Sequence, residues 1–272
     1  MPTNLLHSGE LMAVLTALSW SIGMFPFTEA AKRMGVPALN LFRLTIAVIL
    51  LSIATVLFSD IRFSNLYSSP TSDHWLWLGV SGIIGLTLGD YFGFSSFIHI
   101  GTRLSSVFNT LAPAAALIFG FFINNERVNF IGIAGMIITI AGIIWLALGK
   151  SEKHKAAHLN PGQYSKGILF AILASVCQGI GVVLSQKGLN SPIGNENINP
   201  IHASLIRMIA ATAGAVIVAV VTGRVRPTLQ PILKNHNNGI GYAIAGTLFG
   251  PVIGMALSMA AVSLTSASVA IL

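Results

Sequence analysis

Asp90 is the side chain whose type and position point most directly to chemistry. It lies about sixteen residues into an apolar run that begins near 75, between Leu86-Thr-Leu-Gly and Tyr91-Phe-Gly. A carboxylate at that depth in a bilayer costs at least ~2.5 kcal/mol, so Asp90 should face the interior of a helix bundle or a water-filled cavity. Burial favours the protonated carboxyl group, which suits a proton-coupling role. The alternatives are a neutral Asp hydrogen-bonded to a neighbouring helix and a shallower, wetter position.

Three further side chains could line a cavity with Asp90. Trp20 and Gln178 lie in the middle of two apolar runs, and a shift of the sequence by 158 residues places one on the other. Tyr91 follows Asp90 directly. Together these residues predict a substrate-binding site of mixed aromatic and polar character. The alternative for Trp20 is contact with lipid or with another helix.

Most other charged residues lie at the ends of apolar runs, where we expect the membrane interface. Arg43 and Arg207 lie near the starts of their runs, and long basic side chains there reach the lipid headgroups. Binding of a substrate anion by either arginine is the alternative. Glu29 and Lys187 are expected as interfacial charges. Glu126 is expected to favour the N-terminus of the following helix.

The elements that must position these residues follow from the composition. Hydrophobic residues make up 54% of the 272 residues, and charged residues only 8%. A soluble domain carries about 25% charged residues. A chain so poor in charge cannot cover a water-facing surface, whereas a lipid-facing surface needs no charge. The basic residues are scattered between apolar runs, which argues against nucleic-acid binding.

Apolar runs of about 20 residues, the length that crosses a bilayer, recur along the chain. They are continuous, so we expect helices and not the alternating strands of a barrel. The fold class is therefore an all-α membrane protein with about nine spans, at 11–28, 38–59, 75–98, 104–123, 128–148, 166–185, 201–221, 238–260 and 262 onward. The last run reaches Leu272 after half a span. We expect the native chain to continue, with a Pro at the second position beyond Leu272.

The two halves of the sequence are related. A shift of 161 residues matches one ladder of glycines with another, Gly85, Gly89 and Gly93 with Gly246, Gly250 and Gly254. Shifts of 158 and 164 match Gly23 with Gly181 and Arg43 with Arg207. Glycine at every fourth position lets helices pack closely in a membrane. We therefore expect two five-helix repeats, at 9–149 and 166–272 (incomplete), joined by a polar linker at 150–165.

A repeat of five spans crosses the membrane an odd number of times, so the second repeat enters from the opposite side. Two inverted repeats are the arrangement that secondary transporters use to build a site with access from both sides.

Several motifs follow one another in the first half. They are the region of Trp20, Arg43 at the start of the second span, Leu104-Ser-Ser-Val-Phe-Asn-Thr-Leu-Ala-Pro113 followed by Asn125-Glu126, and Gly132 to Gly142. In this order and spacing they resemble the EamA-type transporters, ten-span members of the drug/metabolite transporter superfamily. The resemblance implies export or exchange of small metabolites by alternating access. It departs at the end, where the second-half Pro and Glu and the tenth span would lie beyond Leu272.

A secondary transporter for a small metabolite or drug-like molecule is the function we expect, with no metal and no cofactor. A channel or a structural membrane protein is the alternative. An intramembrane enzyme is disfavoured because Asp90 has no second mid-span acid and the H-E-x-x-H and C-x-x-C motifs do not occur. The expected partners are a small-molecule substrate and the lipid bilayer, and a homodimer is left open.

The orientation rests on two signals that disagree. The resemblance implies a cytoplasmic N-terminus in a bacterial inner (plasma) membrane. Most of the 15 Lys and Arg residues would then fall outside the cell, whereas positive loops prefer the cytoplasm.

Overall fold

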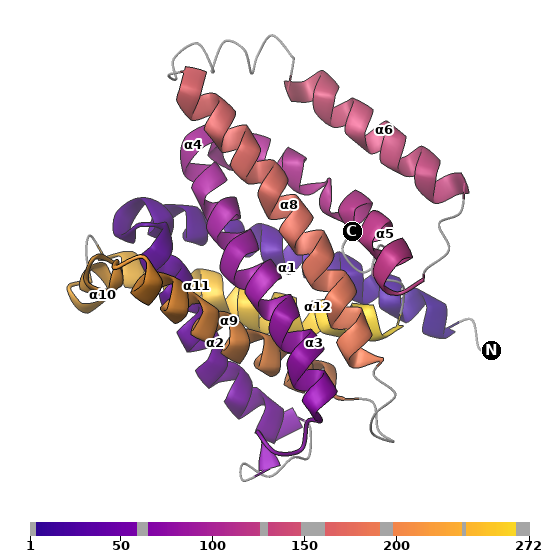
Figure 1. The fold of residues 1–272 in the computed structure, drawn as a ribbon, viewed down its shortest axis with the longest axis horizontal. Helices are drawn as coiled ribbons and strands as arrows, with labels where there is room; N and C mark the ends of the chain where they lie inside the picture. Colours follow the sequence, from indigo (N-terminus) through magenta and orange to yellow (C-terminus); the bar gives the residue numbers. More distant parts are fainter. Residues whose placement is uncertain are drawn as a thin grey trace.

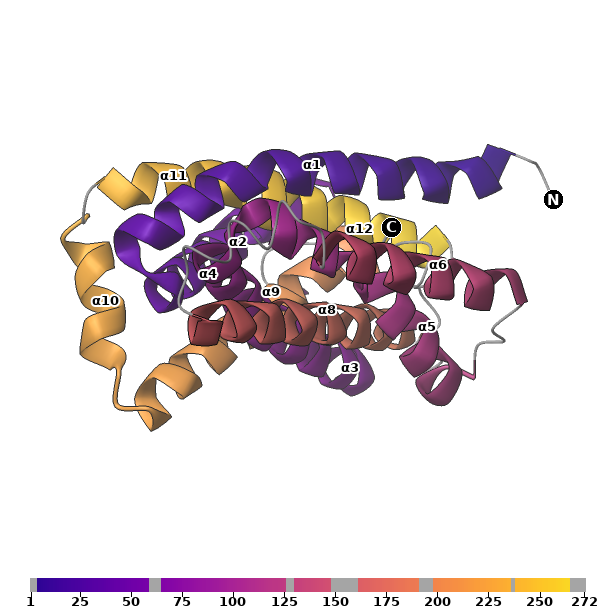
Figure 2. The ribbon, with the colours of Figure 1, turned by 90° about the horizontal axis from the view of Figure 1, so that it is seen from above.

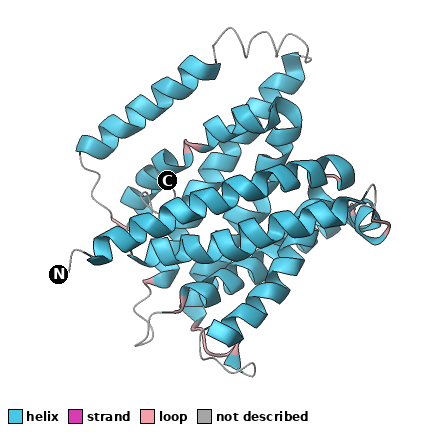
Figure 3. Cartoon of the chain, turned by 180° about the vertical axis from the view of Figure 1, so that it is seen from behind, coloured by secondary structure: helices cyan, strands magenta, loops and turns pink. Residues whose placement is uncertain are grey.

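All regular structure that the computed structural model describes is helical. It describes residues 4–58, 65–125, 130–147, 161–190, 198–235 and 238–264, and Figure 3 shows no strand among them. The helices are α1 (Asn4–Met34), α2 (Val36–Phe58), α3 (Ser72–Gly82), α4 (Asp90–Asn109), α5 (Ala112–Ile123), α6 (Phe130–Ala147), α8 (Pro161–Leu189), α9 (Pro200–Val221), α10 (Val225–Leu233), α11 (Gly239–Thr247) and α12 (Met255–Leu264).

Two long helices contain a π-helical segment. Ile83–Gly89 joins α3 to α4, and Leu248–Gly254 joins α11 to α12. With these joins, the described residues contain six helical stretches that are long and apolar enough to cross a membrane, Leu11–Met34, Val36–Phe58, Ser72–Asn109, Gly162–Leu189, Pro200–Val221 and Gly239–Leu264. The all-α membrane fold expected from the sequence is therefore confirmed. Large hydrophobic side chains cover its outer faces: Phe122, Phe130 and Trp145 are 72%, 83% and 83% exposed.

The third span ends at a turn that glycine makes easy. Gly101 has φ 78° and ψ 161°, a conformation that a side chain disfavours. The chain reverses there and enters the fourth span through the last turns of α4.

The expectation of one continuous fourth helix over 104–123 is wrong. α4 ends at Asn109, and α5 begins at Ala112 after Thr110 and Leu111, which hydrogen-bond three residues back to Val107 and Phe108. Pro113 has no backbone N–H to continue the preceding helix, and its ring clashes with the previous turn. It is tolerated in the first turn of α5 because that position needs no donor.

α10 and α6 also need comparison with the spans predicted from the sequence. α10, over Val225–Leu233, lies between the predicted spans 201–221 and 238–260, where the sequence predicted no helix. The predicted fifth span falls on α6, at the edge of the bundle in Figure 1, where the apolar helix Gly132–Trp145 is shorter than the six candidate spans. Residues 150–160 of the predicted 150–165 linker, the Glu126 turn and the last run beyond 264 lie outside the described residues, whereas residues 161–165 are the first turns of α8.

The helices of the two halves pack in matched pairs. α1, the first span, lies along α11 and α12, the eighth, and Figure 2 shows them side by side. α8, the first span of the second half, lies along α3 and α4, the third span (Figure 1). α2 packs on α9, so the two second spans meet. The first two pairs are equivalent in the repeat, and the third pairs two equivalent helices with each other.

Both glycine ladders face another helix. A methyl group placed on Gly85 would lie 3.5 Å from the Cα of Gly181, and one on Gly89 would lie 3.2 Å from the Cβ of Cys177. In the related pair, a methyl group on Gly23 would lie 3.3 Å from the carbonyl oxygen of Gly246. Gly23 and Gly181 are repeat-equivalent, as are Gly85 and Gly246, so the same close contact forms twice.

Candidate functional site

A cavity of about 310 Å³ lies where the two halves meet. α1, α4 and α8 form most of its wall, and α9 and α12 contribute Arg207, Met255 and Ser258. The lining mixes aromatic rings, such as Trp20, with polar side chains. Of the four residues expected to bind substrate, Trp20, Asp90 and Gln178 line this cavity.

Tyr91 lies elsewhere. It is absent from the cavity wall, and its side chain is 36% exposed on the outer side of α4. Consecutive helix residues point about 100° apart, and this step turns Tyr91 from the cavity toward the exposed face of α4. We leave Tyr91 out of the candidate site.

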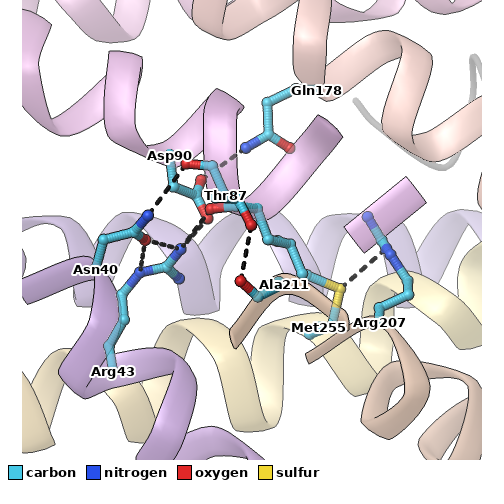
Figure 4. A network of polar contacts seen from close by, with 9 residues as sticks. Asn40, Arg43, Thr87, Asp90, Gln178, Arg207, Ala211 and Met255 are labelled. Atoms are coloured by element: carbon cyan, nitrogen blue, oxygen red, sulfur yellow. Dashed lines mark hydrogen bonds and ion pairs between the residues drawn. The ribbon is translucent and has the colours of Figure 1, made fainter. Parts of the chain in front are cut away.

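Asp90 is the centre of a buried polar network (Figure 4). Its Oδ2 forms an ion pair with Nη2 of Arg43, and its Oδ1 accepts a hydrogen bond from Nε2 of Gln178 at 2.8 Å. Asn40 orients Arg43, because its Oδ1 accepts from Nε at 3.1 Å and from Nη2 at 2.9 Å. The carboxylate therefore links α2, α4 and α8, which come from both halves.

The network also satisfies backbone groups of the π-helical segment before Asp90. Nη2 of Arg43 donates to the carbonyl oxygen of Leu86 at 3.3 Å, and Nδ2 of Asn40 donates to that of Thr87 at 3.1 Å. In the other half, the hydroxyl of Ser19 donates to the carbonyl oxygen of Phe249 at 2.5 Å. π-Helical turns leave backbone carbonyls poorly paired and recur at functional sites. Their position beside the cavity therefore supports the assignment of the cavity as the candidate functional site.

The interfacial interpretation of Arg43 and Arg207 is wrong. Arg43 is 0% exposed and Arg207 is 2% exposed, deep among the helices. Each is the eighth residue of its helix, which places it roughly 10 Å along the axis at about 1.5 Å per residue. At that depth, each guanidinium contacts neighbouring helices of the bundle. Counting residues from the helix start could have revealed this position.

The two halves differ at the positions that matter for chemistry. Gln178 binds Asp90 in the contact between α8 and α4. In the equivalent contact, Trp20 lies on Gly250 and Gly254, with ring atoms 3.0 Å and 2.9 Å from methyl groups placed there. The repeat equivalent of Asp90 is Pro251, which is buried. The polar contact at Gln178 and Asp90 therefore has an aromatic contact at Trp20 as its counterpart in the other pair of helices.

The remaining charged candidates lie away from the cavity. Glu29 pairs with Arg33 at 2.8 Å at the end of α1. Nζ of Lys187 lies 4.1 Å from the ring centre of Trp77. In the part of the chain that the structure describes, no group of three or more His, Cys, Asp or Glu side chains could hold a metal ion.

These features define an integral, multi-pass membrane protein of two inverted helical repeats around a central cavity, the architecture of secondary transporters. The chain belongs to the EamA-like transporter family, which it matches over residues 7–148 and 165–272. The resemblance noted in the sequence is thus confirmed.

A crystal structure of another protein supports the same fold. It superposes with a TM-score of 0.59 and 21% sequence identity, covering 97% of this chain and 83% of that chain. At this identity the likeness concerns the fold alone. No curated protein matches the sequence.

Proposed function

We propose that this protein is a secondary transporter that moves a small metabolite or drug-like molecule across the membrane by alternating access, in efflux or exchange. The observation that carries this proposal is the cavity of about 310 Å³ between the halves, with Trp20, Asp90 and Gln178 in its wall. Its volume is at the lower end of the range for small-molecule sites. Inverted repeats place such a site near the membrane midplane, where rocking of one half against the other opens it to either side.

The units that move are the two repeats, 9–149 and 166–272. Some of the contacts between them are made by pairs of glycines, as between Gly85 and Gly181. Smooth helix faces can shift against one another with little side-chain interlocking. The membrane we propose is the bacterial inner (plasma) membrane.

Asp90 is the coupling residue in this proposal. It joins Arg43 of its own half to Gln178 of the other half. A proton on the carboxyl group would remove its charge and weaken both contacts. The two halves would then separate more easily on the side of the cavity where Asp90 lies, which links proton binding to access.

Counterflow exchange tests the proposal. The full chain is reconstituted in liposomes preloaded with one of a panel of amino acids, nucleosides or carboxylic acids, and uptake of the labelled compound is followed. A carrier gives saturable uptake that the internal compound accelerates. Linear uptake without acceleration would identify a channel, and no flux with any compound would favour a structural role.

A further inference from the structure

Arg207 is a buried cation without an anionic partner among the described residues. Its side chain is 2% exposed and lines the cavity. Nη1 lies 3.2 Å from the sulfur of Met255 and 3.5 Å from that of Met259, and Nε has no hydrogen-bond partner. Thioether sulfur is a weak acceptor, and a guanidinium keeps its charge in proteins. The arginine therefore presents unused donors at the edge of the cavity.

Asp90 makes no direct contact with Arg207. Its Oδ2 pairs with Arg43 and its Oδ1 accepts from Gln178, and Figure 4 shows Arg207 apart from this cluster, beside Met255. Of the eight Asp and Glu residues in the sequence, Asp90 alone lies in the middle of a predicted span. Asp90 and Arg207 line the cavity, and Arg43 lies behind Asp90 in the ion pair, so these three buried charges sum to one positive charge next to the cavity.

The repeat explains where the missing anion belongs. Arg43 and Arg207 are equivalent, and Arg43 has its acid at Asp90 of the third span. The equivalent position of the eighth span is Pro251, so Arg207 has no acid of its own. A carboxylate brought by a bound molecule would restore the pair that the second half lacks.

The cavity has room for that group and for an apolar body. Arg207 is among the residues that line its volume of about 310 Å³. Four aromatic side chains form much of the remaining wall: Trp20, Phe27, Phe94 and Phe97. Rings of this kind bury apolar surface of a ligand without demanding hydrogen bonds from it.

We infer that Arg207 binds the carboxylate of the substrate, and that the substrate class is a small monocarboxylic acid with an apolar or aromatic body. This inference rests on the proposed transport function. The planar guanidinium matches a carboxylate or a phosphate. One negative charge balances the net charge of Arg43, Asp90 and Arg207, whereas a phosphate monoester with about two would overcompensate it.

Thermal unfolding of the purified full chain in detergent tests the binding step, because a ligand of the folded state raises the unfolding midpoint. The probes are matched pairs that differ only in charge, such as phenylacetate with phenylacetamide and isovalerate with isovaleramide. At equal concentration, at least one acid should raise the midpoint and its amide should not. The inference is overturned if no acid stabilises the protein more than its amide does.

Arg207→Met separates this role from a structural one, because the apolar side chain fits between Met255 and Met259. The variant should lose at least tenfold in affinity for the acid and no longer distinguish it from the amide. Arg207→Lys keeps the positive charge but lacks the planar guanidinium that can bind both carboxylate oxygens, so it should retain a weakened preference for the acid. Arg103→Met, an exposed arginine outside the cavity, is the matched control and should bind like the parent. Retained acid preference in Arg207→Met would overturn the assignment.

Counterflow with the same probes distinguishes this inference from the proposed function. Exchange of amides or of a cation such as benzylamine, but not of acids, would keep the transporter and reject the carboxylate site. Binding of acids without any exchange would keep the site and reject transport.

Discussion

Arg43 and Asp90 form an ion pair inside the helix bundle, with side chains 0% and 8% exposed. The pair joins α2 to α4 within the first half, and Gln178 extends it to α8 of the second half. This charge pair holds the helices together, and its strength depends on whether the carboxyl group of Asp90 is protonated.

Removing Asp90 and removing Arg43 should both destabilise the fold, but by different amounts. Removing one partner of a buried pair costs about 3 kcal/mol or more. Asp90→Leu should be worse than Arg43→Met, since an orphaned carboxyl group can take up a proton and an orphaned guanidinium cannot lose one. The double variant should lose less than the sum of the two. Thermal unfolding in detergent measures the three losses, and simple additivity would refute energetic coupling of the pair.

The coupling role of Asp90 predicts a specific transport defect. Asp90→Asn keeps the size and hydrogen-bonding capacity of the side chain but cannot exchange a proton. We expect it to lose accumulation driven by a pH gradient while retaining exchange of substrate. Asp90→Glu, which keeps the titrating group, should retain some gradient-driven uptake. Normal uphill, pH-dependent transport by Asp90→Asn would end the coupling proposal.

Trp20 and Tyr91 should differ sharply when truncated, since only Trp20 lines the cavity. Trp20→Ala removes an aromatic wall and should raise the KM for exchange about tenfold, which corresponds to roughly 1.4 kcal/mol of binding. Tyr91→Ala alters an exposed position on the same bundle and should leave KM unchanged. Initial rates of counterflow over a range of substrate concentrations provide the comparison. Equal effects in both variants would place substrate elsewhere.

Gly82 tests the close approach of the third and seventh spans. A methyl group on it would lie 2.2 Å from the carbonyl oxygen of Arg207, so Gly82→Ala must push two backbones apart. Overpacking of this kind costs about 1–3 kcal/mol. Gly135 of α6 has nothing within 4 Å of the equivalent methyl position, and Gly135→Ala should be neutral or slightly stabilising. Similar unfolding midpoints for the two variants would contradict this packing.

Much of the fold could be predicted because long apolar runs leave the backbone one solution in lipid, the helix. The repeat was also readable, since glycines that permit close helix contact must recur at the same spacing in both halves. The break at Thr110 and Leu111 was missed because Pro113 lies within an otherwise continuous apolar run, and apolar content carries no information about helix direction or interruption.

The residues of the candidate site could be predicted from the sequence only in part. Asp90 stood out since a lone acid in an apolar run needs an interior position, and its pairing with Gln178 follows from the meeting of α4 and α8. Arg43 and Arg207 were misplaced because each lies near the start of its run, where a long side chain could equally reach the headgroups or turn inward.

Composition and the length of the apolar runs are enough to establish that the chain spans a membrane as helices in two related halves, because a low content of charge requires lipid as the solvent and lipid requires a helical backbone. Which arginine pairs with Asp90, and which faces the cavity, could be seen only in the folded chain. Those outcomes depend on side-chain direction and on contacts between spans far apart in sequence, such as α2 with α4 and α9 with α12. The periodicity of a helix indicates which residues share one of its faces, but the contacts of that face depend on which helix packs against it.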